Sequence, residues 1–189
     1  MSLPQPNLFL SSKEDAMHFK ELWTIHNPAK PISLPQLFSI RNISIAGIIA
    51  AVYVALTLIN PWSFGGVQFR LSEALTVLPI LLPQSIPGLF VGVLISNLFS
   101  PVGILDVIFG SLATLLAALI SYGCRRTVWA AMLSPVLVNG LIIGLLLHFV
   151  EHLPLLPTMA SVAFGELVVV LLLGTLLLKS LDRIDLQNR

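Results

Sequence analysis

Long apolar stretches fill this chain, and short clusters of proline, glycine and charged residues separate them. The pattern predicts helical segments at residues 43–60, 70–82, 86–98, 104–122, 128–149 and 157–178. A transmembrane helix needs about 20 apolar residues to cross about 30 Å of hydrocarbon. The second and third segments are too short to cross upright, because an α-helix rises only about 1.5 Å per residue. They could instead form one broken helix.

The composition places the chain among integral membrane proteins. Of its 189 residues, 56% are hydrophobic and 10% are charged, and the mean hydropathy is +0.94. The predicted fold class is therefore all-α, with one membrane domain. The formal net charge of +1 gives no reason to expect nucleic-acid binding, and the single cysteine, Cys124, excludes an intrachain disulfide.

Basic residues favour six crossings over five, because Lys and Arg concentrate in cytoplasmic loops. With six, the N-terminal segment, the loop with Arg125 and Arg126 and the C-terminal tail share the cytoplasmic side, and Arg70 alone lies outside. Merging the two short segments would put at least one basic group on the wrong side. We therefore expect six transmembrane helices in the plasma membrane, with both termini cytoplasmic.

The predicted membrane domain covers residues 43–180, between a cytoplasmic segment at 1–42 and a cytoplasmic tail at 181–189. In the first segment, the residues from Ser12 to about Ile25 suit a short amphipathic helix, and an extended linker is expected from Pro28 to Pro35.

Polar residues of the predicted helices gather toward their outer ends. Counted inward along an α-helix, Asn97 lies at the rim, Asp106 about 3 Å in, Glu73 about 5 Å, Glu166 about 14 Å and Asn139 about 15 Å. Charged groups inside a membrane cost about 2.5 to 3.5 kcal/mol each and commonly mark functional sites. Five polar groups from five helices therefore predict a pocket that opens outward.

Structural roles are also available to most of these residues. Arg70 could extend to the membrane interface or pair with Glu73. Asp106 could favour the dipole of its own helix, Asn97 could cap a turn, and Asn139 could join two helices by a hydrogen bond.

Glu166 is harder to explain structurally, because near mid-membrane it needs a cation, a set of donors or a proton. With three carboxylates against one arginine, the pocket favours a neutral or cationic ligand that is rich in donors. Aromatic residues near its mouth could stack on a flat ring, although such residues more often anchor a protein at the interface. These are Trp62, Phe64, Phe69 and Phe99.

The first apolar segment carries a stripe of small residues, which lets helices approach closely within the bundle or against a partner. It consists of Ala46, Ala50, Ala51 and Ala55, together with Gly47. A similar stripe of Gly110, Ala113, Thr114 and Ala117 lies on the fourth segment, so at least one of the two is expected to be internal packing.

His148, Glu151 and His152 match the H-x-x-E-H pattern of some zinc proteases. The match lies where Pro154 ends the helix, and we expect interfacial histidines and no metal site. The chain also has no Gly-rich loop that ends in Gly-Lys-Ser/Thr, so energy for active transport would come from a partner or an ion gradient.

Several motifs resemble the queuosine-precursor transporter family QueT over residues 43–178. They are Tyr53-Val54-Ala55-Leu56-Thr57, the stretch from Phe64 to Leu75, Pro87-Gly88-Leu89, Asn97, Ser100-Pro101, Asp106 and the stretch from Phe109 to Thr114. The block from Gln68 to Leu75 is the most specific. The resemblance implies a six-helix S component of an energy-coupling-factor (ECF) transporter, which binds 7-deazaguanines such as 7-aminomethyl-7-deazaguanine.

The resemblance further implies docking on a transmembrane scaffold, the T component, and on two ATPases that use ATP, with no cofactor in this chain. The stripe of Ala46, Ala50, Ala51 and Ala55 would contact the scaffold. The predicted substrate-binding residues are Gln68, Phe69, Arg70, Glu73, Asn97, Asp106, Asn139 and Glu166. Alternatives are an S component for another vitamin-like heterocycle, a proton-coupled carrier with Glu166 as the proton site and, last, a metalloprotease.

Overall fold

The structure, a computed structural model, describes residues 25, 28–64 and 69–184, and every regular element in these residues is helical. In chain order they are α2 (Leu34–Leu37), α3 (Ile40–Ile59), the 3-10 helix η1 (Leu71–Ile80), α4 (Ser85–Asn97), the π-helical turn η2 (Asp106–Gly110), α5 (Ser111–Gly123), α6 (Val128–Glu151), α7 (Leu155–Val169), the π-helical turn η3 (Val170–Gly174) and α8 (Thr175–Ile184). The predicted all-α class is confirmed.

Helical segments occupy all the ranges predicted from the apolar pattern. Among the described residues, four helices are long and apolar enough to cross a membrane. They are Ile40–Ile59, Asp106–Gly123, Val128–Glu151 and Leu155–Ile184. The remaining two, η1 and α4, are shorter apolar helices, in agreement with their predicted lengths. The structure therefore supplies four candidate spans, and the count of six crossings stays a prediction.

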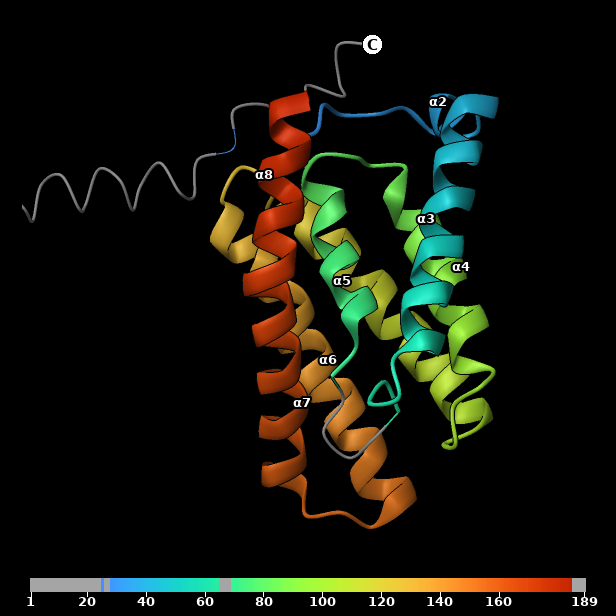
Figure 1. The fold of residues 1–189 in the computed structure, drawn as a ribbon, viewed down its shortest axis with the longest axis vertical. Coiled ribbons are helices and arrows are strands. Elements are labelled where there is room, and N and C mark those ends of the chain that lie inside the picture. The colour runs from blue at the N-terminus through green and yellow to red at the C-terminus, as the bar shows by residue number, and fades with distance from the viewer. Residues whose placement is uncertain (1–24, 26–27, 65–68, 185–189) are drawn as a thin grey trace, which may run out of the picture.

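The short helix η1 lies between the longer helices (Figure 1), and it contacts α3, α4, α5, α6, α7 and α8. All its residues from Ser72 to Ile80 are buried. Gly174 allows this close packing, since a Cβ there would lie 2.9 Å from Val77 Cγ1. A 3-10 helix of this length is uncommon because its hydrogen-bond geometry is poor, so the surrounding helices must hold it in place.

η1 also joins two apolar clusters of the core. Val77 and Ile80 pack in a cluster with the first turn of α6 and with α8, whereas Leu75 and Leu78 pack against α3, α4 and α5. Both clusters thus meet on the same short helix, which fixes its position within the bundle.

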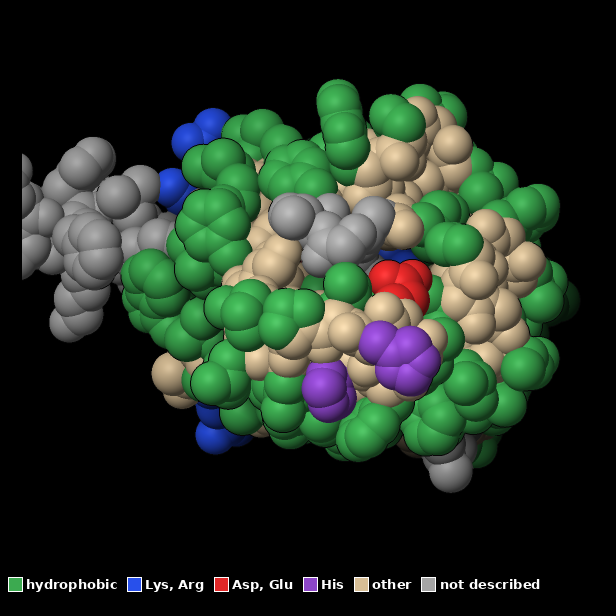
Figure 2. All heavy atoms as spheres, turned by 90° about the horizontal axis from the view of Figure 1, so that it is seen from below, with side chains coloured by type: hydrophobic (Ala, Val, Ile, Leu, Met, Phe, Trp, Pro, Cys, Tyr) green, Lys and Arg blue, Asp and Glu red, His purple; other side chains and the backbone are tan. Residues whose placement is uncertain are grey.

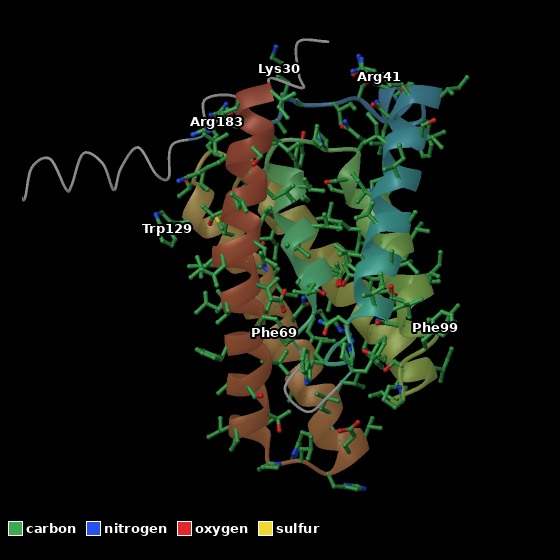
Figure 3. All side chains as sticks on the ribbon, viewed as in Figure 1. Lys30, Arg41, Phe69, Phe99, Trp129 and Arg183 are labelled. Atoms are coloured by element: carbon green, nitrogen blue, oxygen red, sulfur yellow. The ribbon has the colours of Figure 1, made fainter. Side chains whose placement is uncertain are left out.

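The beginning and the end of the described chain lie at the same end of the bundle, where Lys30, Arg41 and Arg183 are labelled (Figures 1 and 3). There the backbone N–H of Ala29 donates to the carbonyl of Ile80 at 2.7 Å. The connection between α6 and α7 lies at the opposite end. The predicted clustering of basic residues is therefore present, while the membrane face that they occupy stays a prediction.

Some predicted boundaries differ from the structure. Residues 28–33 have no regular structure, but α2 begins at Leu34, inside the predicted linker. The last helical segment continues to Ile184, beyond the predicted end of the membrane domain. The amphipathic helix predicted from Ser12 falls outside the described residues.

Candidate functional site

Arg70 precedes η1 as its N-cap residue and is the centre of a buried polar cluster. Its Nε donates to the carbonyl of Ser63 at 2.8 Å, one terminal nitrogen donates to Asn97 Oδ1 at 3.3 Å, and the other pairs with Asp106 Oδ2 at 3.4 Å. Only 5% of Arg70 is exposed. Arg70 therefore does not extend to the membrane interface, and its ion pair is with Asp106 and not with Glu73.

The chain turns sharply before Asp106 to build this cluster. Gly103 has a φ of +77°, which favours glycine, and Asp106 begins η2. Asn97 Nδ2 donates to the carbonyl of Asp106 at 2.9 Å. Gly110 leaves room for both side chains, because a Cβ there would lie 2.8 Å from Asp106 Oδ1 and against the Asn97 amide.

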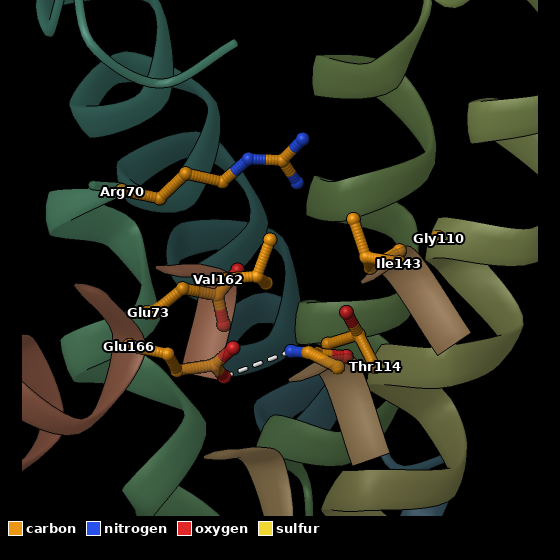
Figure 4. Close-up of a pocket in the computed structure, with 8 residues that line it drawn as sticks. Arg70, Glu73, Gly110, Thr114, Ile143, Val162 and Glu166 are labelled. Carbon is orange, nitrogen blue, oxygen red and sulfur yellow. Dashed lines mark hydrogen bonds between the residues drawn. The ribbon is translucent and has the colours of Figure 1, made fainter. Parts of the chain in front are cut away.

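A small cavity adjoins this cluster (Figure 4). It is lined by Arg70, Glu73, Gly110, Thr114, Asn139, Ile143, Val162 and Glu166. Asn139 Nδ2 donates to Glu166 Oε1 at 2.8 Å, the bond dashed in Figure 4. The second carboxyl group of the lining, Glu73, accepts at its Oε1 from the Tyr53 hydroxyl at 2.5 Å. Four predicted site residues from η1, α6 and α7 therefore surround one space.

The cavity has an excess of carboxyl groups and of acceptors. Within the described residues no ion pair joins Glu73 or Glu166 to a basic side chain, since Arg70 pairs with Asp106. Glu73 Oε2 and Asn139 Oδ1 are buried, and no donor from the described residues reaches them. Buried acceptors are normally hydrogen-bonded, and buried carboxylates are normally paired. The site is therefore suited to a ligand that brings donors and positive charge.

The cavity is small in this structure. The volume open to the centre of a water molecule is about 10 Å³, enough for roughly one water. Pockets that hold drug-sized molecules measure about 300 to 1,000 Å³. Four residues of the predicted pocket thus line a space that, in this structure, is too small for a heterocycle.

The aromatic residues do not line this cavity. Phe69 is half-buried, and its carbonyl accepts from Asn60. Trp62 and Phe99 are 68% and 61% exposed, as expected of interfacial anchors. Phe64 lies against Arg70, with its ring centre 5.2 Å from the guanidinium carbon. Gln68 falls outside the described residues.

Tyr53 was not among the predicted site residues. Its sequence signal is a lone aromatic hydroxyl within an otherwise mainly aliphatic helix, and that signal gives no indication of its partner, Glu73.

His148 and His152 lie near the end of α6, where each is placed by the local backbone. His148 Nδ1 contacts the carbonyl of Leu153 at 2.6 Å, and His152 ends α6 with a φ of 56°. Figure 2 shows both histidines on the end face of the bundle. The described residues contain no group of three or more His, Cys, Asp or Glu that could hold a metal ion.

The small-residue stripe of α3 divides between two faces. Ala46 and Ala50 face α4, because a Cβ on Gly88 would lie 2.6 Å from the carbonyl oxygen of Ala46 and one on Gly92 would lie 3.1 Å from that of Ala50. Ala51 and Ala55 are exposed, as is Gly47. Ala46 and Ala50 also line a surface groove between α3 and α4, so docking at either part of the stripe stays a prediction.

Comparison with known proteins connects this site to a transport family. The QueT transporter family matches residues 43–183. The queuosine precursor transporter QueT of Lactococcus lactis subsp. cremoris is 31% identical over 160 residues, which cover 75% of this chain and 92% of that protein. No solved structure matches the chain significantly.

Proposed function

The chain belongs to the QueT transporter family, and from that premise we propose that it is the S component of an ECF importer. The proposed substrate is a 7-deazaguanine precursor of queuosine such as 7-aminomethyl-7-deazaguanine. The protein is a multi-pass membrane transporter and not an enzyme.

The observation that carries the substrate proposal is the pair of carboxylates, Glu73 and Glu166, that line one cavity without a basic partner in the described residues. An aminomethyl group would bring one ammonium to this pair. The N–H groups of a guanine edge would supply donors to acceptors such as Asn139 Oδ1. Arg70, Asn97 and Asp106 would support the site from the adjoining cluster.

The position of η1 supports an outward-facing site. Ile80 is the last residue of η1, and its carbonyl accepts a hydrogen bond from Ala29. This contact lies at the end of the bundle that carries Lys30 and Arg183. Arg70 and Glu73, at the beginning of η1, therefore lie toward the other end. If the basic end faces the cytoplasm, as basic residues near membrane helices generally do, the cavity lies in the outer half of the membrane. This topology has six crossings, with η1 and α4 shielded by the longer helices.

For the coupling partners, we assign the exposed face of α3 to the T component. Gly47, Ala51 and Ala55 form a surface on which another helix could pack closely. Ala46 and Ala50 also pack against α4. Two partner ATPases would supply the energy from ATP.

Calorimetry on the purified protein in detergent tests the substrate. We expect tight binding of 7-aminomethyl-7-deazaguanine without ATP and weaker binding of guanine, because guanine leaves a buried carboxylate without its cation. Equal affinities would contradict the contact between ammonium and carboxylate. Absence of binding to either compound would contradict the proposed substrate class.

Uptake into proteoliposomes tests the mechanism. We expect uptake only when the T component and the ATPases are present with ATP. Uptake by the isolated chain, driven by a proton gradient, would instead support a proton-coupled carrier that uses Glu166.

A further inference from the structure

Tyr53 hydrogen-bonds to a residue that lines the cavity but does not line the cavity itself. It is fully buried on α3 and is absent from the lining of the cavity, but its hydroxyl donates to Glu73 Oε1 at 2.5 Å. The other carboxylate oxygen, Oε2, is buried and has no donor from the described residues. Glu73 therefore has one oxygen fixed by the protein and one left for another partner.

The Tyr53 ring has little freedom to move. It packs in an apolar cluster with Leu75, Leu89 and Val93. On α4, Gly92 lets the two helices approach so closely that a Cβ there would lie 2.9 Å from the Cβ of Tyr53. The hydroxyl is thus held in one place, and it holds Glu73 in turn.

We propose that Tyr53 is a positioning residue that makes the site selective for a cationic ligand over a neutral one, through its hydrogen bond to Glu73. The inference rests on the proposed function, since it concerns the same cavity and ligand class. A donor stabilises an ionised carboxylate, and an ionised Glu73 with a free oxygen attracts an ammonium. Without the hydroxyl, Glu73 would be left in an apolar environment, where a carboxyl group favours its neutral form.

The test is Tyr53→Phe, which removes one oxygen and keeps the ring. The matched control is Thr57→Val, one helical turn further along, because Thr57 Oγ1 lies 2.7 Å from Ser72 Oγ and 2.9 Å from the Tyr53 carbonyl and touches no carboxylate. Calorimetry would compare 7-aminomethyl-7-deazaguanine with guanine for both variants.

We expect Tyr53→Phe to weaken binding of the aminomethyl compound about tenfold and to change guanine affinity much less, since a hydrogen bond to a charged group is lost. Thr57→Val should leave the ratio of the two affinities unchanged. In a Glu73→Gln background, Tyr53→Phe should have no further effect on that ratio, because its partner charge is already absent.

An equal loss for both ligands, or an unchanged ratio, would overturn the inference and leave the proposed function intact. A persistent effect of Tyr53→Phe in the Glu73→Gln background would also overturn it. If the unaltered protein binds neither ligand, both this inference and the proposed substrate class are wrong.

Discussion

Replacing Glu166 by glutamine separates a ligand-binding role from a structural one. Glu166 is 4% exposed, and its Oε1 accepts from Asn139 Nδ2 at 2.8 Å. Glutamine has the same shape and retains an oxygen for that bond. The substitution therefore removes the charge and changes little else.

A ligand-binding role predicts that Glu166→Gln weakens ligand binding, and a structural role predicts that it destabilises the protein. A hydrogen bond from a ligand to a charged group contributes about 1.5 to 3 kcal/mol, so Glu166→Gln should weaken binding of 7-aminomethyl-7-deazaguanine about 10-fold to 150-fold. The empty protein should be no less stable, because no ion pair within the described residues is broken and an unpaired buried charge is removed.

Calorimetry of ligand binding and thermal unfolding without ligand, in one detergent, measure the two effects. Glu73→Gln should weaken binding by a similar amount. The control is Glu151→Gln, because Glu151 is exposed at the end of α6. The reasoning fails if Glu151→Gln weakens binding while the other two substitutions do not. It also fails if Glu166→Gln destabilises the empty protein, since Glu166 would then be structural.

Two further predictions concern docking and the polar cluster. Ala51→Leu, on the exposed face of α3, should abolish uptake by the assembled transporter and leave ligand binding of the isolated subunit unchanged. Ala50→Leu should instead lower the melting temperature, because Ala50 is buried against α4. Normal uptake with Ala51→Leu would show that the scaffold docks elsewhere. Asp106→Asn should destabilise the protein by about 3 kcal/mol, because Arg70 then remains as a buried cation without its 3.4 Å partner, and wild-type thermal unfolding would contradict this.

The positions of the polar residues could largely be predicted from the sequence. Counting depth along the helices placed five polar residues in the outer half of the bundle, and the structure brings three of them, Glu73, Asn139 and Glu166, around one cavity. The count could not separate them from Asn97 and Asp106, which face the other side of Arg70. That separation depends on the turn at Gly103 and on the missing side chain at Gly110, which are effects of local packing and not of depth.

The faces of α3 could not be predicted, because a membrane protein is apolar toward both its core and the lipid. Polarity therefore carries no signal that separates a buried alanine from a lipid-facing one. Ala50 and Ala51 are adjacent and chemically identical, but one is buried and the other exposed. The deciding signal lies on another helix, in the glycines at 88 and 92 that accept the close approach of α3.

The 3-10 form of η1 has a consequence for the site, although the apolar pattern gave no sign of it. Ile80 is fixed at the basic end by Ala29, and Glu73 lies seven residues earlier. Seven residues extend about 14 Å in a 3-10 helix but only about 10.5 Å in an α-helix. An α-helical η1 anchored at the same point would therefore place Glu73 about 3.5 Å nearer the basic end. The greater rise per residue of η1 thus helps to place its carboxylate at the cavity that Glu166 and Asn139 line.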